Sequence, residues 1–183
     1  QELLQRFRSQ WTRVGCLNGE HAEARLQQGL TSLEQFWQGE AGLPSAPTLV
    51  EREFTVRLDD VRIRGRIDRA DERDGKVIIT DYKSSDVRTQ ETADQKANES
   101  LQLSIYAFAY QVMFQRWPDE LTLHFVESGI VGRSPIHQHP LDAHTGRIRQ
   151  VVAGIRAQQF AARPSIMRCR SCSYRSICEF SSE

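Results

Sequence analysis

The sequence predicts an α/β fold, with a central mixed sheet flanked by helices. Two observations predict it. Two successive segments of the 183-residue chain show the apolar and polar alternation of β-strands, and a third begins as a short apolar run. Segments on either side of them carry apolar residues at the three- and four-residue spacing of amphipathic helices. We therefore expect an antiparallel meander over residues 49–84, packed against a helix near residues 94–116 and a C-terminal helix.

The charge balance restricts the class of protein. The 24 Lys and Arg residues equal the 24 Asp and Glu residues, which excludes a uniformly basic protein that coats nucleic acid but leaves room for a local basic groove. No apolar run approaches the roughly 18 residues of a membrane-spanning helix, and no secretory signal opens the chain. We expect a cytoplasmic protein with no membrane partner. The only methionines are Met113 and Met167, and we expect the chain to be part of a longer protein.

Residues 1–40 are expected to be helical. Apolar residues recur there at helical spacing, namely Leu3, Leu4, Phe7, Trp11, Leu26, Leu30, Leu33 and Phe36. Two antiparallel strands are expected next, over residues 51–58 and 61–68. Apolar and charged residues alternate in both segments, and the tight acidic turn Asp59–Asp60 joins them.

A third strand is expected over residues 77–83. Its first residues are apolar on both faces, which indicates a strand that is covered on both sides. Four further elements follow in order: a helix over residues 94–115, a strand over residues 121–125, a strand over residues 134–141, and a helix that runs from about residue 148 toward Arg163–Pro164. The chain has no G-x-x-x-x-G-K-[ST] phosphate-binding loop, so ATP-driven activity would lie outside it.

Asp81 and Lys83 are unexpected in a buried strand. Their side chains point to the same face, about 6–7 Å apart along the strand, because the side-chain period of a strand is two. One interpretation is a structural salt bridge at the sheet edge. The other adds Asp68, near the end of the preceding strand, because two carboxylates at a sheet edge form a hard-oxygen site for a divalent ion such as Mg²⁺. A lysine beside that ion can position a water molecule or stabilise a negatively charged transition state.

Three motifs then occur in a fixed order. They are Gly65-Arg66-Ile67-Asp68-Arg69-Ala70-Asp71, Ile79-Thr80-Asp81-Tyr82-Lys83-Ser84-Ser85 and Gln102-Leu103-Ser104-Ile105-Tyr106. The set resembles the motifs G-x-x-D-R-x-D, D-Y-K-[TS]-[SG] and Q-L-x-x-Y of the RecB-like branch of the PD-(D/E)XK nuclease superfamily. Such domains are found at the C-terminus of UvrD/Rep-type (AddB-like) ATP-dependent DNA helicases.

The resemblance implies a restriction-endonuclease-like core and a set of site residues. Asp68 and Asp81 would be ligands of Mg²⁺ or Mn²⁺, together with the backbone carbonyl of Tyr82. Lys83 would be the catalytic lysine. Gln102 and Tyr106, four residues apart on one helix face, would lie beside the site. The reaction would be hydrolysis of DNA phosphodiester bonds.

The resemblance also implies the surroundings of the domain. The chain would be a single nuclease domain over residues 1–183, with a helical segment (1–40), a nuclease core (49–162) and a Cys-rich tail (163–183). It would belong to a helicase–nuclease of DNA repair, with exonuclease as one possible mode, and would act on single-stranded ends or unwound duplex beside the helicase motor of the same polypeptide. The alternative is a catalytically lapsed DNA-binding or structural module on this fold, against which the retention of Asp68, Asp81 and Lys83 together counts.

RecB-like nucleases carry an upstream histidine that completes metal binding. His21 is the only histidine before Asp68. It lies in Trp11–Phe36, which resembles the helical segment that follows the family histidine, so we expect His21 on a helix surface. Glu51 is expected at the surface, with a supporting acidic role left open. Arg69 and Asp71 match the first motif, and ion pairing is their expected role.

The tail contains Cys169, Cys172 and Cys178 in the pattern C-x2-C-x5-C. The pattern is compatible with a zinc site and with thiols that bind no metal. In the resembling family, a C-terminal trio joins a distant upstream cysteine to hold a [4Fe–4S] cluster. Cys16 is the only other cysteine, and its sequence context differs, so we expect an ordinary thiol there. The cluster would belong to the full-length protein, and its presence in this chain stays open.

Arginines are the candidate phosphate contacts. Arg62, Arg64 and Arg66 alternate on the strand that leads to Asp68, and we expect Arg66 and Arg64 to contact DNA on the face of Asp68. A solvated arginine face is the alternative. Between Arg163 and Cys178 the tail adds four arginines without an acid: Arg163, Arg168, Arg170 and Arg175. His137 and His139 alternate on the expected fifth strand and are assigned no role.

Overall fold

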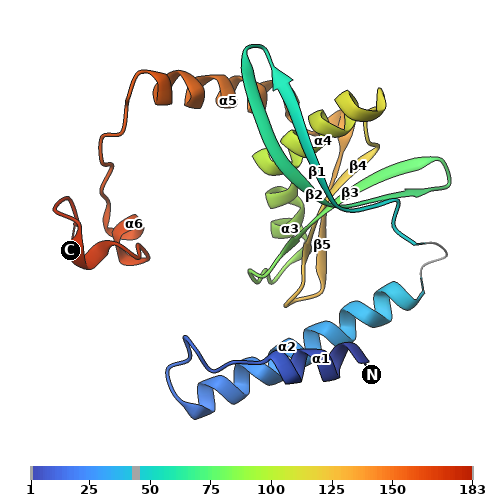
Figure 1. Cartoon of the computed structure of the whole chain (residues 1–183), viewed down its shortest axis with the longest axis vertical. Coiled ribbons are helices and arrows are strands. Elements are labelled where there is room, and N and C mark those ends of the chain that lie inside the picture. Colours follow the sequence, from blue (N-terminus) through green and yellow to red (C-terminus); the bar gives the residue numbers. More distant parts are fainter. Residues whose placement is uncertain (1, 43–45, 183) are drawn as a thin grey trace. The chain divides into compact units, whose positions relative to one another are not determined.

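A computed structural model describes residues 2–42 and 46–182 of the chain. It divides into two compact units, one that ends at His144 and one that begins at Thr145. Figure 1 traces both units. Helix α5 (Leu141–Arg156) contains the boundary between them.

The first unit is built on a five-stranded mixed sheet, as the sequence predicted. Its strands lie in chain order, β1 to β5. The β1–β2, β2–β3 and β4–β5 pairs are antiparallel, whereas β3 and β4 are parallel. The strands are β1 (Leu49–Leu58), β2 (Val61–Arg73), β3 (Lys76–Lys83), β4 (Glu120–Phe125) and β5 (Ile130–Pro135).

The helical segment expected over residues 1–40 is two helices, α1 (Glu2–Gln10) and α2 (Gly19–Ala41), and residue 1 lies outside the described residues. Asn18 begins α2, because its side chain accepts the backbone N–H of His21. Near its other end, Phe36 contacts the rings of Tyr82 and His124 on the sheet. Helix α2 therefore packs against the face of β3 that carries Tyr82.

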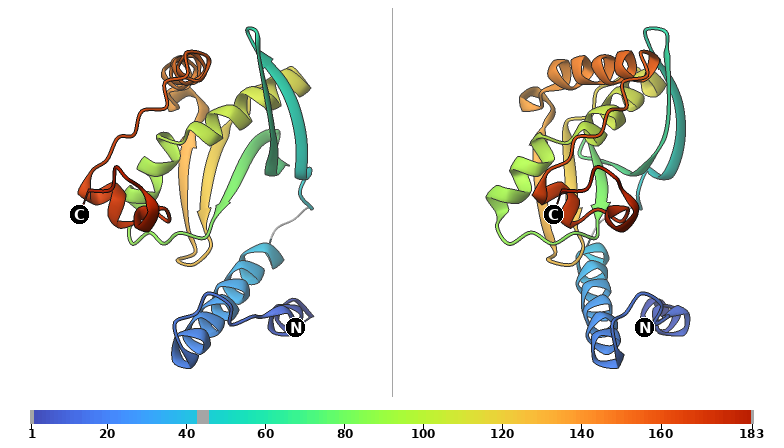
Figure 2. Two further views of the ribbon diagram at one scale, coloured as in Figure 1. Left: turned by 60° about the vertical axis from the view of Figure 1, so that its left-hand side comes forward. Right: turned by 90° about the vertical axis from the view of Figure 1, so that its left-hand side faces the viewer.

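The single helix expected over residues 94–115 is also two helices. They are α3 (Gln90–Asn98) and α4 (Leu101–Phe114). Ser100 separates them because its side chain caps the new helix by accepting the N–H of Leu103. Together they form the connection that parallel pairing of β3 and β4 requires, and Figure 2 shows them crossing the sheet (green).

The fifth strand was predicted in the wrong place. It covers residues 130–135, and Ile136–Gln138 form a 3₁₀ turn, η1, instead of a continuing strand. Pro135 and Pro140 flank this turn and lack the N–H that a ladder needs. The prediction followed apolar alternation and overlooked both prolines.

The core of the first unit lies between the sheet and helices α3 and α4. The fully buried side chains include Ile67, Ile79, Leu103, Leu121 and Phe125. On β3, Val77 and Ile79 are buried whereas Ile78 and Thr80 are half-buried. The strand is thus covered on both sides, more completely on the side of α4.

Two ladders that share β3 end at different points. The β2–β3 ladder ends at the pair Arg69 and Thr80, whereas the β3–β4 ladder continues to Lys83 and Phe125. The hairpin of β1 and β2 therefore leaves β3 before the D-Y-K motif begins. This separation of strands positions the candidate site.

The second unit contains most of α5, then α6 (Ile166–Arg170) and the 3₁₀ turn η2 (Arg175–Ile177). Helix α5 ends at Arg156, whereas the sequence predicts a helix that runs toward Arg163–Pro164. Gln158 adopts a left-handed conformation with φ of 53°, and the N–H of Gln159 returns to the carbonyl of Gly154. This geometry ends a helix. Among the described residues of the chain, no helix is long and apolar enough to cross a membrane.

Candidate active site

Asp68 lies where β2 separates from β3. Its Oδ2 accepts the backbone N–H of Tyr82 at 3.1 Å, and its Oδ1 accepts the hydroxyl of Tyr106 at 3.3 Å. No ladder pair joins the two strands beyond Arg69 and Thr80. The carboxylate therefore takes the place of a ladder acceptor, which ties its position to the backbone of the D-Y-K motif.

Asp81 is almost completely buried, with 1% of its surface exposed. Its Oδ2 lies 2.7 Å from Nζ of Lys83, but this contact lacks hydrogen-bond geometry, and Oδ2 has no hydrogen-bond partner among the described residues. Burial raises the pKa of Asp81, the ammonium of Lys83 opposes that rise, and the negative charge of Asp68 adds to it. A buried carboxylate of this kind is stabilised by a cation.

The donor set fits a hard divalent cation. It consists of carboxylates from adjacent strands, one of which has a buried oxygen without a hydrogen-bond partner. No group of three or more His, Cys, Asp or Glu side chains that could hold a metal occurs in the part of the chain that the structure describes. A cation held by Asp68 and Asp81 would complete its coordination with the Tyr82 carbonyl and with water, and Mg²⁺ keeps several waters in protein sites.

A directional hydrogen-bond chain joins Lys83 to Asp68 through helix α4. Lys83 Nζ donates to Gln102 Oε1 at 2.7 Å, Gln102 Nε2 donates to Tyr106 Oη at 2.8 Å, and that hydroxyl donates to Asp68. An ammonium only donates, so it fixes the orientation of the amide and then of the hydroxyl. Burial is the main cause that raises the pKa of Tyr106 to about 12, which keeps the phenol protonated as a donor.

The structure brings together Asp68, Asp81, Lys83, Gln102 and Tyr106, the five residues to which the sequence assigns catalytic roles. Lys83 is the more exposed partner of the pair that it forms with Asp81, with 33% of its side chain accessible. The site is therefore closed around the carboxylate of Asp81 and open at the ammonium. Such an arrangement can hold a cation and present a positive group to a bound anion.

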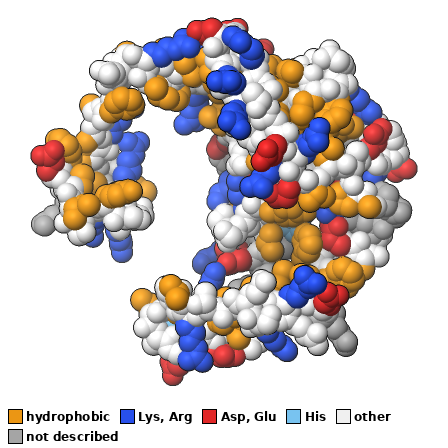
Figure 3. Space-filling model, in the orientation of Figure 1, with side chains coloured by type: hydrophobic (Ala, Val, Ile, Leu, Met, Phe, Trp, Pro, Cys, Tyr) orange, Lys and Arg blue, Asp and Glu red, His pale blue; other side chains and the backbone are white. Residues whose placement is uncertain are grey.

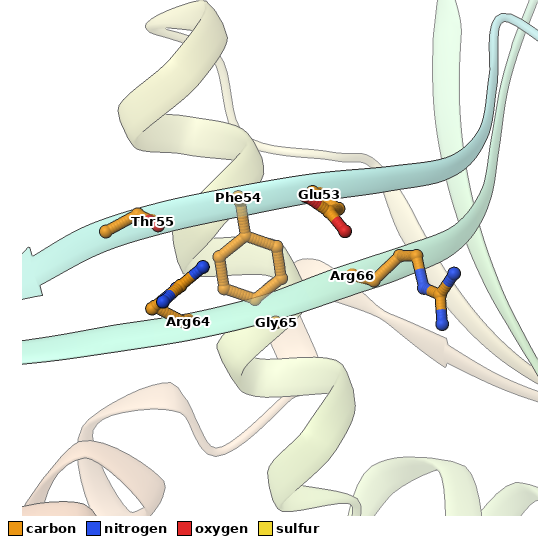
Figure 4. A pocket seen from close by; sticks show the side chains of 6 residues that line it. All are labelled: Glu53, Phe54, Thr55, Arg64, Gly65 and Arg66. Carbon is orange, nitrogen blue, oxygen red and sulfur yellow. The ribbon is translucent and has the colours of Figure 1, made fainter.

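Arg64 and Arg66 do not lie where the sequence predicted. A Cβ on Gly65 would lie 2.5 Å from the Phe54 ring, and that ring packs edge-on against Tyr106. The two arginines flank Gly65 on the strand, so they point to the opposite, outward face. They line a surface hollow of about 540 Å³ together with Glu53 and Thr55 (Figure 4).

Arg66 and Asp68 were expected on the same face of the strand. They do not share a face, because the alternation of side-chain direction along the strand is interrupted between them. Glu51 lies opposite Asp68 with a left-handed φ of 50°, and the two are not a ladder pair. Glu51 is exposed and forms a salt bridge of 3.0 Å with Arg66. A role of Arg64 and Arg66 in DNA contact stays a prediction, but a path from these arginines to Asp68 and Asp81 does not follow one strand face.

The remaining candidates lie apart from the five central residues. His21 is half-buried at the start of α2, where its Nδ1 accepts the N–H of Leu17. Cys169 accepts a hydrogen bond from Ser182 Oγ at 3.4 Å, and this bond is the main cause that lowers its pKa to about 7. All four cysteines are free thiols.

The tail cysteines Cys169, Cys172 and Cys178 do not converge into a group that could hold a metal, within the residues described. Neither zinc nor a [4Fe–4S] cluster therefore has support from the described geometry.

One polar cluster was missed by the sequence analysis. His139 is buried, and its two ring nitrogens contact Ser104 Oγ and Ser134 Oγ at 2.7 and 2.9 Å. Ser104 also contacts Nδ1 of His144 at 2.5 Å. A serine at the third position of the Q-L-S-I-Y motif, next to buried apolar residues, was the one available signal for a buried partner.

Comparison with known proteins identifies the family. The chain matches the sequence model of the PD-(D/E)XK nuclease superfamily over residues 1–179. It is 28% identical over 177 residues to the Gene 69 protein of Mycobacterium phage D29, a match that covers 88% of this chain and 62% of that protein. The chain thus spans about 62% of the length of this relative.

A solved structure supports the fold. The crystal structure of SSO0001 matches 99% of this chain and 82% of its own chain, with a TM-score of 0.54 and 16% sequence identity. The shared fold is the α/β arrangement of a mixed sheet with flanking helices, which agrees with a restriction-endonuclease-like core. From the family match over almost its whole length, the chain belongs to the PD-(D/E)XK nuclease superfamily.

Proposed function

We propose that this chain is a divalent-metal-dependent deoxyribonuclease that hydrolyses DNA phosphodiester bonds with Mg²⁺ or Mn²⁺. The observation that carries the proposal is the buried Asp81 oxygen without a hydrogen-bond partner among the described residues, on a carboxylate whose pKa is raised by its burial and by nearby Asp68. Lys83 reaches both this carboxylate and the amide of Gln102. Membership of a nuclease superfamily supports the reaction class.

The residues of the chain divide the chemistry among them. Asp68, Asp81 and the Tyr82 carbonyl would hold the cation, which when bound neutralises charge on the phosphate and lowers the pKa of a water molecule. Lys83 presents its ammonium beside this position, where it can orient the attacking water or stabilise negative charge that develops on the phosphate. Gln102 holds that ammonium through its carbonyl oxygen, and Tyr106 holds Asp68.

We propose further that the domain belongs to a RecB-like helicase–nuclease of DNA repair and acts on single-stranded ends or unwound duplex. The support is the order and spacing of the three motifs that carry Asp68, Asp81–Lys83 and Gln102–Tyr106. The helicase motor would be supplied by another part of the same polypeptide. An assignment of residues 49–162 as the nuclease core is part of this proposal.

The test is a DNA degradation assay with Mn²⁺ and with Mg²⁺, on single-stranded DNA and on blunt duplex. We expect Lys83→Ala to lower the rate by about a hundredfold or more, because one preorganised charge contributes about that factor. The matched control is Lys76→Ala, which removes an exposed lysine from the other end of the same strand.

Two results would contradict the proposal. One is cleavage by Lys83→Ala at the rate of the unchanged chain. The other is a chain, or an N-terminally extended version of it, that binds DNA but cuts it with neither metal, which is the behaviour of a catalytically lapsed DNA-binding module. Isothermal titration with Mn²⁺ alone separates a chain that lacks the metal from a chain that holds it without activity.

A further inference from the structure

A buried ion cluster lies on the face of the sheet that α2 covers. Arg69 is 6% exposed. Its Nε and Nη2 contact the two oxygens of Asp71 at 2.7 and 2.9 Å, and its Nη1 contacts Glu40 Oε1 at 2.7 Å. Arg73 binds Asp71 as well, at 2.9 Å. Two arginines thus face two carboxylates, and the cluster is formally neutral.

The contacts of Arg69 and Asp71 fix the protonation states of these two residues. Burial acts to lower the pKa of Arg69, but hydrogen bonds to Asp71, Glu40 and Tyr82 outweigh burial and hold the pKa above its ordinary value. Burial acts to raise the pKa of Asp71, but the two arginines outweigh it and hold that pKa below the ordinary value. Arg69 and Asp71 therefore both stay charged at neutral pH.

The same guanidinium binds the middle residue of the D-Y-K motif. Arg69 Nη1 donates to the hydroxyl of Tyr82 at 3.1 Å. The Tyr82 ring packs against both Phe36 and His124, with ring centroids 5.7 and 5.6 Å away, and these two rings also contact each other. Burial is the main cause that raises the pKa of the Tyr82 phenol, so the hydroxyl stays neutral and accepts the bond from Arg69.

Two neighbouring residues of β2 therefore hold Tyr82 at two points. Asp68 accepts its backbone N–H, and Arg69 donates to its phenol. Tyr82 in turn lies between Asp81 and Lys83, in the stretch of β3 that β2 no longer pairs with. The backbone there is held on its β2 side by these two bonds and on its other side by the β4 ladder.

We propose that the phenol of Tyr82 and the Arg69–Asp71–Glu40 cluster are positioning residues for the cation site. They hold the backbone of Asp81–Lys83 at the twist that directs the Asp81 carboxylate and the Tyr82 carbonyl toward Asp68. The inference rests on the proposed function, because it assigns a role in that site. It extends the site through the sheet to helix α2, which supplies Glu40 from its last turn and Phe36 one turn earlier.

The chemistry of the cluster favours positioning over stability. Buried ion pairs contribute little net stability compared with well-packed apolar residues, because both charges lose their hydration. A phenylalanine ring would pack against Phe36 and His124 as the Tyr82 ring does. What the hydroxyl adds is one bond of fixed direction, which orders the motif but gives little packing.

The experiment compares the full chain with Tyr82→Phe. We expect the dissociation constant for Mn²⁺, measured by titration and by electron paramagnetic resonance, to rise about five- to tenfold. The turnover number on DNA should fall by about tenfold, with KM for DNA within about twofold and the melting temperature within about 2 °C. Tyr110→Phe is the matched control, since Tyr110 is a buried tyrosine of α4 that packs on Phe114 and not on the motif.

Amide hydrogen exchange provides a readout that needs neither metal nor activity. With no metal added, we expect exchange at Tyr82 and Lys83 to be about fivefold faster or more in Tyr82→Phe and in Glu40→Gln, and unchanged in Tyr110→Phe. Unchanged exchange and unchanged Mn²⁺ affinity in Tyr82→Phe would overturn the inference. So would a fall in melting temperature as large as that of a core substitution, because the role would then be structural.

The two proposals fail in different ways. If the unchanged chain neither binds Mn²⁺ nor cuts DNA, the proposed function fails, and faster exchange in Tyr82→Phe still supports the ordering of the motif. If the unchanged chain binds Mn²⁺ and cuts DNA but Tyr82→Phe does so equally, the proposed function stands and the positioning role is wrong.

Discussion

At the scale of single residues, His139 shows how a buried polar group is fixed by its neighbours. Ser134 donates to Asn98, so its oxygen accepts the Nδ1–H of His139. The other ring nitrogen contacts Ser104 Oγ at 2.7 Å. Burial is the main cause that lowers the pKa of His139 to about 4, and the charge of His144 adds to it.

This histidine predicts a dependence of stability on pH. Its pKa is about 4 in the folded chain and about 6.5 when unfolded, so the unfolded chain binds more protons between these values. The stabilising contribution is present above about pH 6.5 and decreases as pH falls toward 4. We expect the free energy of unfolding to fall by about 2 kcal/mol between about pH 7.5 and about pH 5, measured with urea.

The control is an exposed histidine two residues earlier. His139→Gln should remove most of this pH dependence, whereas His137→Gln, in the exposed part of η1, should leave it unchanged. Equal pH dependence in the two variants would show that another group is responsible.

Residue by residue, the candidate site was more predictable than its surroundings. Asp68, Asp81 and Lys83 could be placed together because strand order and a period of two fix which side chains meet. Arg66 could not be placed correctly, because the left-handed Glu51 opposite Asp68 interrupts that period, and no residue preference marks the interruption. His139 was missed because its partners come from α4 and β5, on elements that the sequence does not show to be neighbours.

At the scale of elements, β5 and α3 approach each other closely at a glycine. A Cβ on Gly132 would lie 2.1 Å from the carbonyl oxygen of Ala93. The obstacle is helix backbone, which cannot turn aside as a side chain can. We expect Gly132→Ala to lower the free energy of unfolding by about 1–3 kcal/mol or more, measured by chemical denaturation.

Gly146→Ala is the matched control for this substitution. A Cβ there meets no atom within 4 Å among the described residues, and the position lies inside helix α5. Alanine is the better helix former, so an increase of up to about 1 kcal/mol is expected. If both substitutions change stability equally, the packing of β5 on α3 is looser than the structure indicates.

Elements were predictable where local pattern decides them. Strands β1, β2 and β4 follow from alternation, β3 follows from its short apolar run, and the parallel step from β3 to β4 follows from the long helical connection. The break between α3 and α4 depends on one capping bond between Ser100 and Leu103. The end of β5 depends on prolines at 135 and 140. Hydrophobic periodicity predicts neither the break between the two helices nor the end of β5.

At the scale of the whole chain, the zero net charge is the sum of opposite net charges on the two units. Residues 145–183 contain seven arginines and two glutamates, which is a formal charge of +5, and the residues before them therefore carry −5. Arginine side chains (blue) are visible on this C-terminal unit in Figure 3. An enzyme that holds a cation needs acidic residues, and one that holds DNA needs basic residues, so this separation is compatible with the proposed function.

The charge separation predicts that the C-terminal unit supplies much of the affinity for DNA. We expect replacement of Arg168, Arg170 and Arg175 by Gln to raise the dissociation constant for DNA about tenfold at about 0.1 M salt. The slope of log affinity against log salt should become shallower by roughly 0.7–0.9 for each phosphate that is no longer neutralised by an arginine. The rate at saturating DNA should stay nearly unchanged, because Lys83 and the two carboxylates belong to the other unit.

The matched control removes the same charge from the first unit, with Arg8, Arg13 and Lys76 replaced by Gln, all of which are exposed. Binding is measured by fluorescence anisotropy of labelled DNA over a range of salt concentrations. If the arginines that bind phosphate are confined to residues 145–183, only the first triple variant changes the slope. An equal decrease of DNA affinity in both triple variants would mean that affinity follows total charge. An unchanged salt slope in the C-terminal triple variant would assign DNA binding to the outward arginines of the β1–β2 hairpin. The salt slope of Arg64→Gln would then test that assignment.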